Sequence, residues 1–191
     1  TNGSLPHWHQ TGKLTFVTFR LHDSVPKTVI DHILSEYEQR LVLNEGGYDK
    51  KTLETWKWEK YNRIEKYLDK GSGECLLKNP ECRNIVSDAL LHFDNIRYNL
   101  LSYVIMPNHV HIMIMQTGNN AIPEIIRRYK SVTSCRYIEG VKTRGWQRFD
   151  GNLWQKSYFD HIIRNQRAHD YIAQYIIDNP KRWNKDNINP H

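Results

Sequence analysis

Cysteine is scarce in this 191-residue sequence, and the three cysteines present, Cys75, Cys82 and Cys135, form neither a paired framework nor a CxxC motif. Small secreted domains that depend on disulfides are therefore excluded, and a reduced, cytosolic setting is expected. No secretory signal is visible in the sequence. The chain begins at Thr1 without a methionine, which leads us to expect that its natural start lies further upstream.

Charged side chains are missing from residues 98–123, and such a stretch raises the question of a membrane-spanning helix. Pro107, His109 and His111 interrupt the stretch, and polar groups of this kind are costly in the hydrocarbon core of a bilayer. Several asparagines add to that cost: Asn99, Asn108, Asn119 and Asn120. The stretch therefore belongs to a soluble protein that makes no membrane contact, and its two histidines need another explanation.

Internal repeats and low-complexity tracts are also absent, which excludes solenoid and fibrous classes. The composition, 39% hydrophobic and 25% charged residues, is that of a globular protein with a buried core. A chain of 191 residues has about the length of one domain, so we treat residues 1–191 as a single domain.

Positive charge is concentrated in one segment. The net charge of the whole chain is +6, and residues 127–148 contain seven lysines and arginines but one acid, Glu139. Tyr129, Tyr137 and Trp146 lie among these cations. Cations interleaved with aromatic rings suit a nucleic acid, whose bases can stack on the rings. A solvated basic face is the alternative that the composition leaves open.

Strands and helices alternate along the hydrophobic pattern, which indicates an α+β fold with helices packed on an antiparallel sheet. The expected strands are 13–22, 97–106, 109–116 and 156–163. The expected helices begin after Pro26, cover 52–70, begin again at Asn79, and cover 121–138 and 166–178. Residues 45–78 are interpreted as a helical insertion, because the pattern on either side would close without them.

Two histidines lie one residue apart in an apolar strand. Residues two apart point to the same face of a strand, so His109 and His111 project together while Val110 and Ile112 project into the core. Two neighbouring imidazoles on a rigid strand can hold a metal. A core or surface pair without a metal is the alternative, because two ligands do not complete a site.

The last helix offers further ligands. Asn165 is an expected N-cap, and Tyr175 and Asn179 lie four residues apart on its apolar face. If this face covers the histidines, it delivers a carboxamide oxygen and a phenol to the metal. A packed Tyr175, and an Asn179 that ends the helix before Pro180, are the alternative.

Three segments together, MPNHVHIMI, LWQKSYFDHIIRN and YIAQYIIDNPKRW, resemble the IS200-like transposases, especially the REP-associated tyrosine transposases. These belong to the HUH endonucleases, named for the pattern His-hydrophobic-His. The likeness covers residues 97–183 in the same order, and residues 13–44 are compatible with it. Residues 45–78 have no clear place in the family pattern.

The resemblance implies a fold and a mechanism. The fold is a ferredoxin-like antiparallel sheet with helices on one face and the His pair on a central strand. A divalent metal, Mg²⁺ or Mn²⁺, is held by His109, His111 and Asn179. Tyr175 attacks the scissile phosphate of single-stranded DNA next to a hairpin, which leaves a 5′-phosphotyrosine and a free 3′-hydroxyl that can later rejoin strands. Tyr171, one turn earlier, is the second candidate for the nucleophile.

The resemblance also implies partners and a location. Candidate phosphate contacts are the cations of the basic segment and of the strand after it: Arg127, Arg128, Lys130, Lys156 and Arg164. The expected partner is single-stranded DNA with a hairpin, in the prokaryotic cytoplasm or nucleoid. Some relatives exchange the tyrosine helix between subunits, so a homodimer remains an option.

Three alternatives remain open from the sequence. A replication initiator or relaxase would use the same His pair, but usually in a longer chain. A domesticated transposase would keep the fold as a non-catalytic hairpin-binding protein. A zinc hydrolase would need an acidic general base near the histidines, and no acid lies at a telling spacing.

Overall fold

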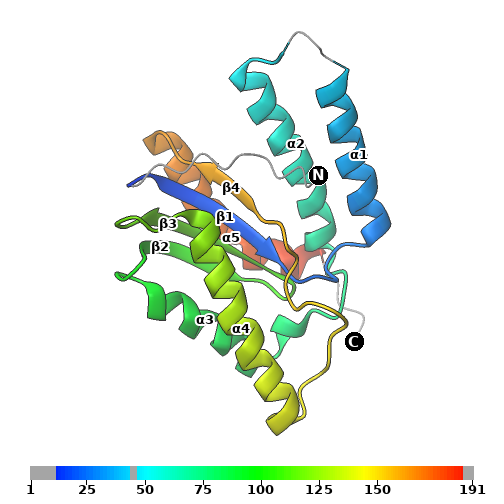
Figure 1. Ribbon diagram of the computed structural model, residues 1–191, viewed down its shortest axis with the longest axis vertical. Coiled ribbons are helices and arrows are strands. Elements are labelled where there is room, and N and C mark those ends of the chain that lie inside the picture. The colour runs from blue at the N-terminus through cyan, green and yellow to red at the C-terminus, as the bar shows by residue number, and fades with distance from the viewer. Residues whose placement is uncertain (1–11, 44–46, 187–191) are drawn as a thin grey trace.

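The computed structural model describes residues 12–43 and 47–186. Its centre is an antiparallel sheet of four strands in the order β2-β3-β1-β4 (Figure 1). The strands are β1 (Leu14–Arg20), β2 (Tyr98–Ile105), β3 (His109–Gln116) and β4 (Phe159–Ile162). All four expected strands are present, and β4 is shorter than predicted.

If the helices between β1 and β2 are taken as one connection, the elements follow a β-α-β-β-α-β order and end with a last helix. They are α1 (Lys27–Val42), α2 (Lys50–Asp69), the short 3-10 helix η1 (Leu76–Lys78), α3 (Pro80–Phe93), α4 (Ile122–Arg144) and α5 (Gln166–Asp186). With β1 and β3 in the middle of the sheet, this is the ferredoxin-like topology that the family resemblance implied. The prediction of an α+β fold is confirmed.

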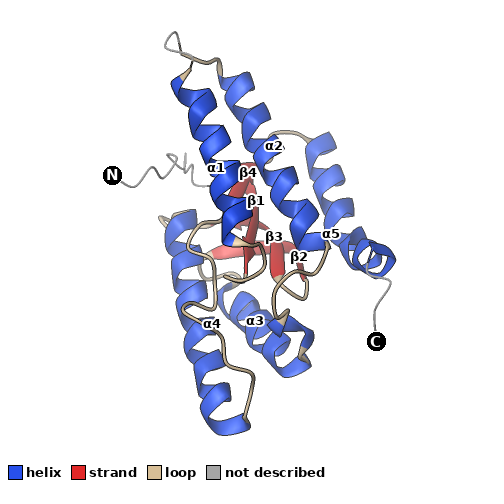
Figure 2. Ribbon diagram, turned by 90° about the vertical axis from the view of Figure 1, so that its right-hand side faces the viewer, coloured by secondary structure: helices blue, strands red, loops and turns tan. Residues whose placement is uncertain are grey.

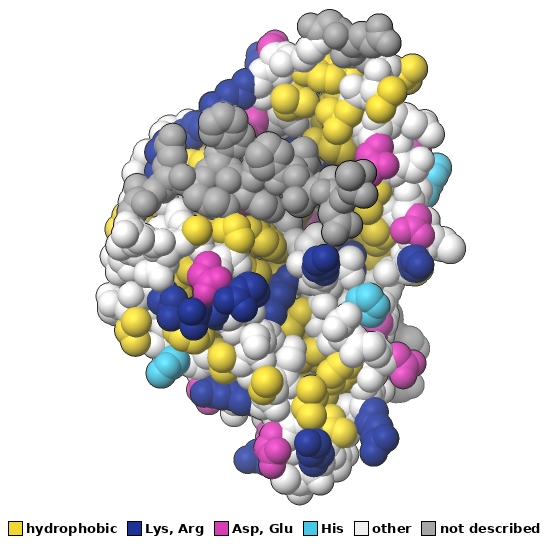
Figure 3. Space-filling view, viewed as in Figure 1, with side chains coloured by type: hydrophobic (Ala, Val, Ile, Leu, Met, Phe, Trp, Pro, Cys, Tyr) yellow, Lys and Arg dark blue, Asp and Glu magenta, His cyan; other side chains and the backbone are white. Residues whose placement is uncertain are grey.

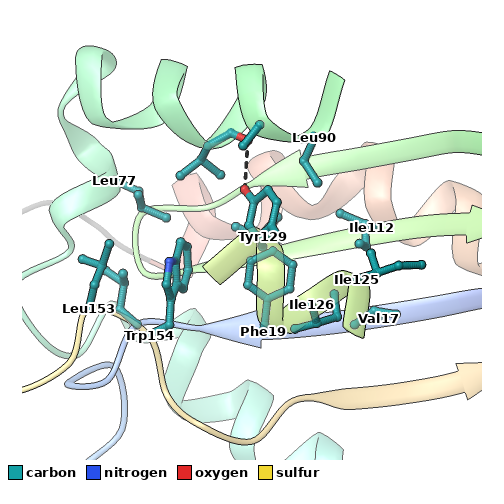
Figure 4. Close-up of a cluster of buried hydrophobic side chains, with 14 of the residues drawn as sticks. Val17, Phe19, Leu77, Leu90, Ile112, Ile125, Ile126, Tyr129, Leu153 and Trp154 are labelled. Atoms are coloured by element: carbon teal, nitrogen blue, oxygen red, sulfur yellow. Dashed lines mark hydrogen bonds between the residues drawn. The ribbon is translucent and has the colours of Figure 1, made fainter. Parts of the chain in front are cut away.

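One face of the sheet carries the larger core, against α3 and α4. Alternate residues of β1 and β3, such as Val17, Phe19 and Ile112, point to this side, as strand periodicity requires. Tyr129 of α4 packs against Phe19 of β1, with the ring centroids 5.0 Å apart, and its hydroxyl donates to the carbonyl of Val86 at 2.9 Å (Figure 4). This layer corresponds to the predicted helices on one face.

The opposite face is covered by α2 and α5, which adds a second helical layer to the predicted one (Figure 2). Phe16 and Met113 point to this side, where they meet Tyr61 of α2 and Ile176 of α5. The two histidines of β3 share this face with Phe16. The two histidines therefore lie on a face that is covered by two helices far apart in the sequence.

The α1–α2 pair projects from the body of the molecule as a helical hairpin (Figure 1). Arg40 of α1 and Glu59 of α2 form an ion pair at 2.7 Å within it. Helix α2 thus makes up most of the expected insertion and forms the second arm of the hairpin. Residues 45 and 46 of the expected insertion lie outside the described residues. Among the described helices, none combines the length and the apolar character needed to cross a membrane.

Two helices are longer than predicted. Helix α4 runs to Arg144 and ends at Gly145, whose φ of 67° is the left-handed conformation that favours glycine at a helix end. Helix α5 continues through Pro180 to Asp186, although it was expected to end at residue 178. A proline removes one helical hydrogen bond, but its fixed φ is helical, so the tendency of Asn179 to leave the helix is overridden.

Candidate metal centre and tyrosine

His109 and His111 lie side by side and are completely buried. Their Nε2 atoms are 2.9 Å apart, and their ring centroids are 4.6 Å apart. Two nitrogen lone pairs at this separation repel one another unless a proton or a cation lies between them. The shared face predicted for the pair is confirmed, and both Nε2 atoms point to one place.

The other nitrogen of each imidazole is held by a neighbour. The Asn108 amide nitrogen donates to the carbonyls of Leu68 and Ser72, so its oxygen faces His109 Nδ1, at 2.7 Å. That oxygen can only accept, so Nδ1 of His109 carries the proton and Nε2 keeps its lone pair. Thr18 Oγ1 lies 2.7 Å from His111 Nδ1. These partners fix both rings in the orientation that a metal ligand needs.

A third group, Glu65 of α2, completes the cluster. Its Oε2 lies 3.5 Å from Nε2 of His111, and ligand atoms of Glu65, His109 and His111 all lie within 4.8 Å of one another. The other carboxylate oxygen, Oε1, is buried and has no hydrogen-bond partner among the residues that the structure describes. Two imidazoles and a buried carboxylate with an unused oxygen form a donor set for a divalent cation.

The sequence analysis did not identify Glu65, because it looked for an acid at a telling spacing from the histidines in the sequence. Glu65 precedes His109 by 44 positions and lies in the segment that was interpreted as an insertion. The sequence did contain a signal, because Tyr61, Glu65 and Leu68 are spaced so that they share one face of a helix. In the structure all three are buried. An acid within the apolar stripe of a helix is rarely buried unless it has a partner.

Burial disfavours each isolated charge in this cluster. It lowers the pKa of His109 to about 3 and, together with His109, holds the pKa of His111 well below its usual range. Burial also raises the pKa of Glu65 to about 8, against the effect of a hydrogen bond from Tyr175. Both imidazoles are therefore neutral at pH 7, the form in which they bind metals. A bound cation would favour the ionised carboxylate.

Tyr175 of α5 reaches this cluster. Its hydroxyl donates a hydrogen bond to Glu65 Oε2, and its ring centroid lies 5.3 Å from that of His111. Burial, and then Glu65, raise the pKa of the phenol above its usual value. Tyr171, the second candidate, is 68% exposed and does not share the buried face. The structure thus brings Tyr175 to the histidines and leaves Tyr171 at the surface.

Asn179 is buried one turn after Tyr175, with 1% of its surface exposed. Its amide oxygen has no hydrogen-bond partner in the described part of the chain. Helix α5 begins as expected, because Asn165 Oδ1 accepts from the backbone N–H of Ala168 at 2.8 Å. Asn179 therefore offers an unused oxygen from the predicted helix face, but it makes no hydrogen bond to either histidine within the described residues.

The expected DNA contacts fall into two groups. Arg127 and Arg128 are exposed on α4, and both form ion pairs with Glu124. Lys and Arg side chains gather on the face of the molecule that carries this helix (Figure 3). Lys130 differs from the expectation, because its ammonium donates to the main-chain carbonyls of Gln155, Lys156 and Ser157, at 2.6, 3.3 and 3.2 Å. It joins α4 to the segment before β4, and its donors are turned toward protein and away from a phosphate.

Lys156 and Arg164 are exposed at the surface. Lys156 and Arg127 line a groove of about 400 Å³ between α4 and residues 149–158. Arg164 lies 3.5 Å from Glu54 of α2, outside that groove. A basic groove is therefore present on the side of the sheet opposite to the His pair.

The two tyrosines of the basic segment do not form the expected stacking surface. Tyr129 and Tyr137 are buried in the core, and their hydroxyls donate to the carbonyls of Val86 and Gln147. They follow the apolar stripe of α4, which turns them away from solvent. The cations of this segment are thus separated from its tyrosines by the two faces of one helix.

A family model described as "Transposase IS200 like" matches residues 79–179, which is more than half of the chain. The chain belongs to the IS200-like transposase family. The matched residues include the His pair and Tyr175. The match begins after β1, α1 and α2, so Glu65 lies outside the matched residues.

Two curated proteins are similar to parts of the chain. An uncharacterized protein of Haemophilus influenzae is 29% identical over 111 residues, which cover 45% of this chain and 56% of the relative. The ISDra2 transposase TnpA of Deinococcus radiodurans is 30% identical over 78 residues, which cover 40% of this chain and 54% of the relative. The chain thus spans about half the length of these curated relatives.

A solved structure of a REP-associated tyrosine transposase bound to a REP hairpin also resembles the chain. It is 14% identical in sequence, with a TM-score of 0.48, and the likeness covers 95% of this chain and 74% of the other.

Proposed function

We propose that this transposase cleaves and rejoins single-stranded DNA at sites next to a hairpin, through a 5′-phosphotyrosine intermediate on Tyr175. The observation that carries the proposal is the convergence of Tyr175, Glu65 and the His pair. A phenol beside two neutral imidazoles and a carboxylate places a nucleophile next to a potential metal-binding site. The choice of a hairpin substrate rests on the resemblance of the three sequence segments to the REP-associated group.

The donor set fits a divalent metal. His109 and His111 would hold it through Nε2, and Glu65 would supply the third ligand through its unused Oε1. Asn179 remains a proposed further ligand, since its buried amide oxygen also lacks a hydrogen-bond partner within residues 12–43 and 47–186. When bound, the ion would act as a Lewis acid that stabilises negative charge on the phosphate in the transition state. Mg²⁺ and Mn²⁺ both accept oxygen ligands, and Mn²⁺ tolerates two imidazoles better.

Tyr175 would act as the nucleophile. Its oxygen forms the new bond to phosphorus, and the 3′-oxygen of the preceding nucleotide leaves. The phenolic proton already points at Glu65 Oε2, so that carboxylate is the natural acceptor. The reverse attack by a 3′-hydroxyl re-forms the phosphodiester and returns the proton to Tyr175. Because the phosphotyrosine bond conserves the energy of the phosphodiester, rejoining needs no nucleotide cofactor.

Glu65 also favours an alternative, because a His-His-Glu set is suited to metal-dependent hydrolysis of a phosphodiester. In that reaction water attacks, and Glu65 serves as the general base. The two reactions differ in one product: hydrolysis leaves no bond between protein and DNA. A non-catalytic hairpin-binding protein would produce neither cleavage nor a covalent bond.

The test is a covalent capture experiment. Wild-type protein incubated with hairpin-containing single-stranded DNA and Mn²⁺ or Mg²⁺ should give an adduct that survives a denaturing gel and maps to Tyr175. Tyr175→Phe should bind DNA and metal but give no adduct, since the substitution removes only the attacking oxygen. Tyr171→Phe is the matched control and should retain full yield.

His111→Ala should abolish the metal-dependent reaction while leaving DNA binding nearly intact, because surface cations supply most of the affinity. Cleavage without an adduct in the wild type would favour the hydrolase. A normal adduct yield from Tyr175→Phe would contradict the assignment of the nucleophile.

A further inference from the structure

Tyr61 of α2 is a second tyrosine in the buried cluster. It is 5% exposed and lies one helical turn before Glu65 on the same face of α2. Its ring centroid lies 6.2 Å from that of Phe16, and the ring of Tyr175 lies at the same distance from Phe16. Both rings are nearly perpendicular to Phe16, and they come from helices that contact each other over the sheet (Figure 2). The proposed reaction gives a role to Tyr175 and none to Tyr61.

The hydroxyl of Tyr61 belongs to a network of buried hydrogen bonds. It lies 3.2 Å from Thr18 Oγ1, and that oxygen lies 2.7 Å from Nδ1 of His111. It also hydrogen-bonds to the hydroxyl of Tyr175 and to the carboxylate of Glu65. Burial has the largest effect on the pKa of Tyr175 and raises it, whereas the hydrogen bond with Tyr61 acts in the opposite direction. A chain of hydrogen bonds thus joins a proposed metal ligand to the proposed nucleophile.

The proposed role of His111 as a ligand sets the direction of this chain. His111 would bind through Nε2, so the single proton of its neutral ring is on Nδ1 and is donated to Thr18. Among the described residues, the Thr18 hydroxyl has hydrogen bonds to His111 and Tyr61, so its own proton points to the Tyr61 oxygen. The proton of Tyr61 is then donated to the pair that Tyr175 and Glu65 form.

We infer that Tyr61 is a positioning residue that holds the hydroxyl of Tyr175 beside Glu65 for attack on the phosphate. The inference rests on the proposed function, because it takes Tyr175 as the nucleophile. A hydrogen bond donated by Tyr61 occupies one lone pair of the Tyr175 oxygen and leaves the other for attack, which restricts the direction of approach. The ring of Tyr61 is itself fixed, because the ring of Phe159 stacks on it at 4.0 Å. Helix α2 would thus supply a positioning group in addition to Glu65.

The test compares Tyr61→Phe with wild type. Phenylalanine keeps the ring that packs on Phe159 and Phe16 and removes one oxygen, so the fold should persist. At saturating Mn²⁺ and DNA, the rate of adduct formation should fall on the order of 100-fold, because a positioned donor is lost. The affinities for Mn²⁺ and for DNA should stay near the wild-type values, since every proposed ligand and the Thr18–His111 contact are retained. A loss of packing alone would lower stability without separating the rate from the affinities.

Tyr129→Phe is the matched control. It also removes a buried tyrosine hydroxyl, which donates to the carbonyl of Val86 on the opposite side of the sheet. The control should lose stability, because the carbonyl loses its partner, and should keep the wild-type rate of adduct formation.

A second measurement does not depend on cleavage. In protein whose tyrosines carry an NMR-active carbon isotope at Cζ, the Tyr175 resonance is identified by its loss in Tyr175→Phe. Tyr61→Phe should shift that resonance, because the shielding of Cζ depends on the hydrogen bonds of the hydroxyl. Tyr129→Phe should leave it in place.

The two measurements separate the inference from the proposed function. A folded Tyr61→Phe that forms the adduct at the wild-type rate, or that leaves the Tyr175 resonance unshifted, would overturn the inference and leave the proposed reaction standing. If the wild type forms no adduct and Tyr61→Phe still shifts the resonance, the proposed reaction is wrong, and the contact between the two phenols stands.

Discussion

At the scale of single residues, the site is held together by groups that satisfy one another. Asn108 orients His109, Thr18 orients His111, and Glu65 accepts from Tyr175. Each of these partners is uncharged or shares its charge with a neighbour, which is how a cluster this deeply buried avoids isolated charges. Removing one partner should therefore change metal affinity more than it changes folding.

Glu65→Gln tests the carboxylate directly. The substitution preserves shape but removes the negative charge, so Mn²⁺ affinity measured by calorimetry should fall by at least about tenfold, and adduct formation should be lost. Thermal stability should stay the same or rise, because a buried carboxyl is costly to ionise. Glu59→Gln on the same helix is the control, since Glu59 pairs with Arg40. Unchanged Mn²⁺ affinity in the Glu65 variant would exclude this residue as a ligand.

Thr18→Val tests the support of His111. Valine keeps the branched shape that a strand favours but cannot hydrogen-bond to Nδ1 of His111 or to the Tyr61 hydroxyl. We expect Mn²⁺ affinity to fall by about 10–100-fold, the usual effect of removing a group that orients a ligand. Thr15→Val is matched, because Thr15 is also buried on β1 but on the opposite face. Equal losses in both variants would indicate a general disturbance of the strand.

At the scale of elements, the site depends on α2, β3 and α5, while α4 is tied to the segment before β4 by Lys130. Burial, and then the positive charge of Arg20, lower the pKa of the Lys130 amine to about 7. The three carbonyls that accept from it favour the ammonium form and oppose this shift. The balance between these effects can be measured as a dependence of stability on pH.

The pKa of Lys130 is lowered in the folded state, so the unfolded chain binds more protons between pH 7 and the usual lysine pKa. Stability should therefore rise with pH in that range. Between pH 7 and 9, the free energy of unfolding of the wild type should increase relative to Lys130→Met by up to about 1 kcal/mol per pH unit. Urea unfolding at several pH values measures the difference. A difference that stays constant would mean that the carbonyls keep the ammonium charged.

At the scale of the whole molecule, metal binding should couple the two ends of the chain. The proposed ligands come from α2, which precedes the matched family region, and from β3 within it, and α5 adds Tyr175. Because an unfolded chain does not hold these groups together, a metal that binds them stabilises the folded state.

Addition of Mn²⁺ at about 100 times its dissociation constant should stabilise the wild type by roughly 2.7 kcal/mol, or on the order of 5–10 °C in melting temperature. A chelator should reverse the shift, and His109→Ala should show none. Differential scanning calorimetry provides the measurement. A shift of the same size in His109→Ala would place the bound metal elsewhere on the protein.

The sequence by itself determined most of the fold. Strand alternation in 13–22 and 109–116 placed Val17, Phe19 and Ile112 in one core, and turn and cap residues such as Asn79 and Asn165 located the helix starts. These features are local, because they depend on residues within a turn or a strand of one another. For the same reason the shared face of His109 and His111 was predictable from their spacing alone.

Only the tertiary structure decided what completes the site. Glu65 meets His111 because α2 packs across the sheet, and neither residue carries a local sign of the other. Likewise, the sequence analysis predicted that Lys130 contacts a phosphate. In the structure its ammonium donates hydrogen bonds to the main-chain carbonyls of residues 155–157. Contacts between residues far apart in the chain depend on how whole elements pack. Spacing in the sequence does not encode that packing, whereas it does encode the face of a strand on which two histidines lie.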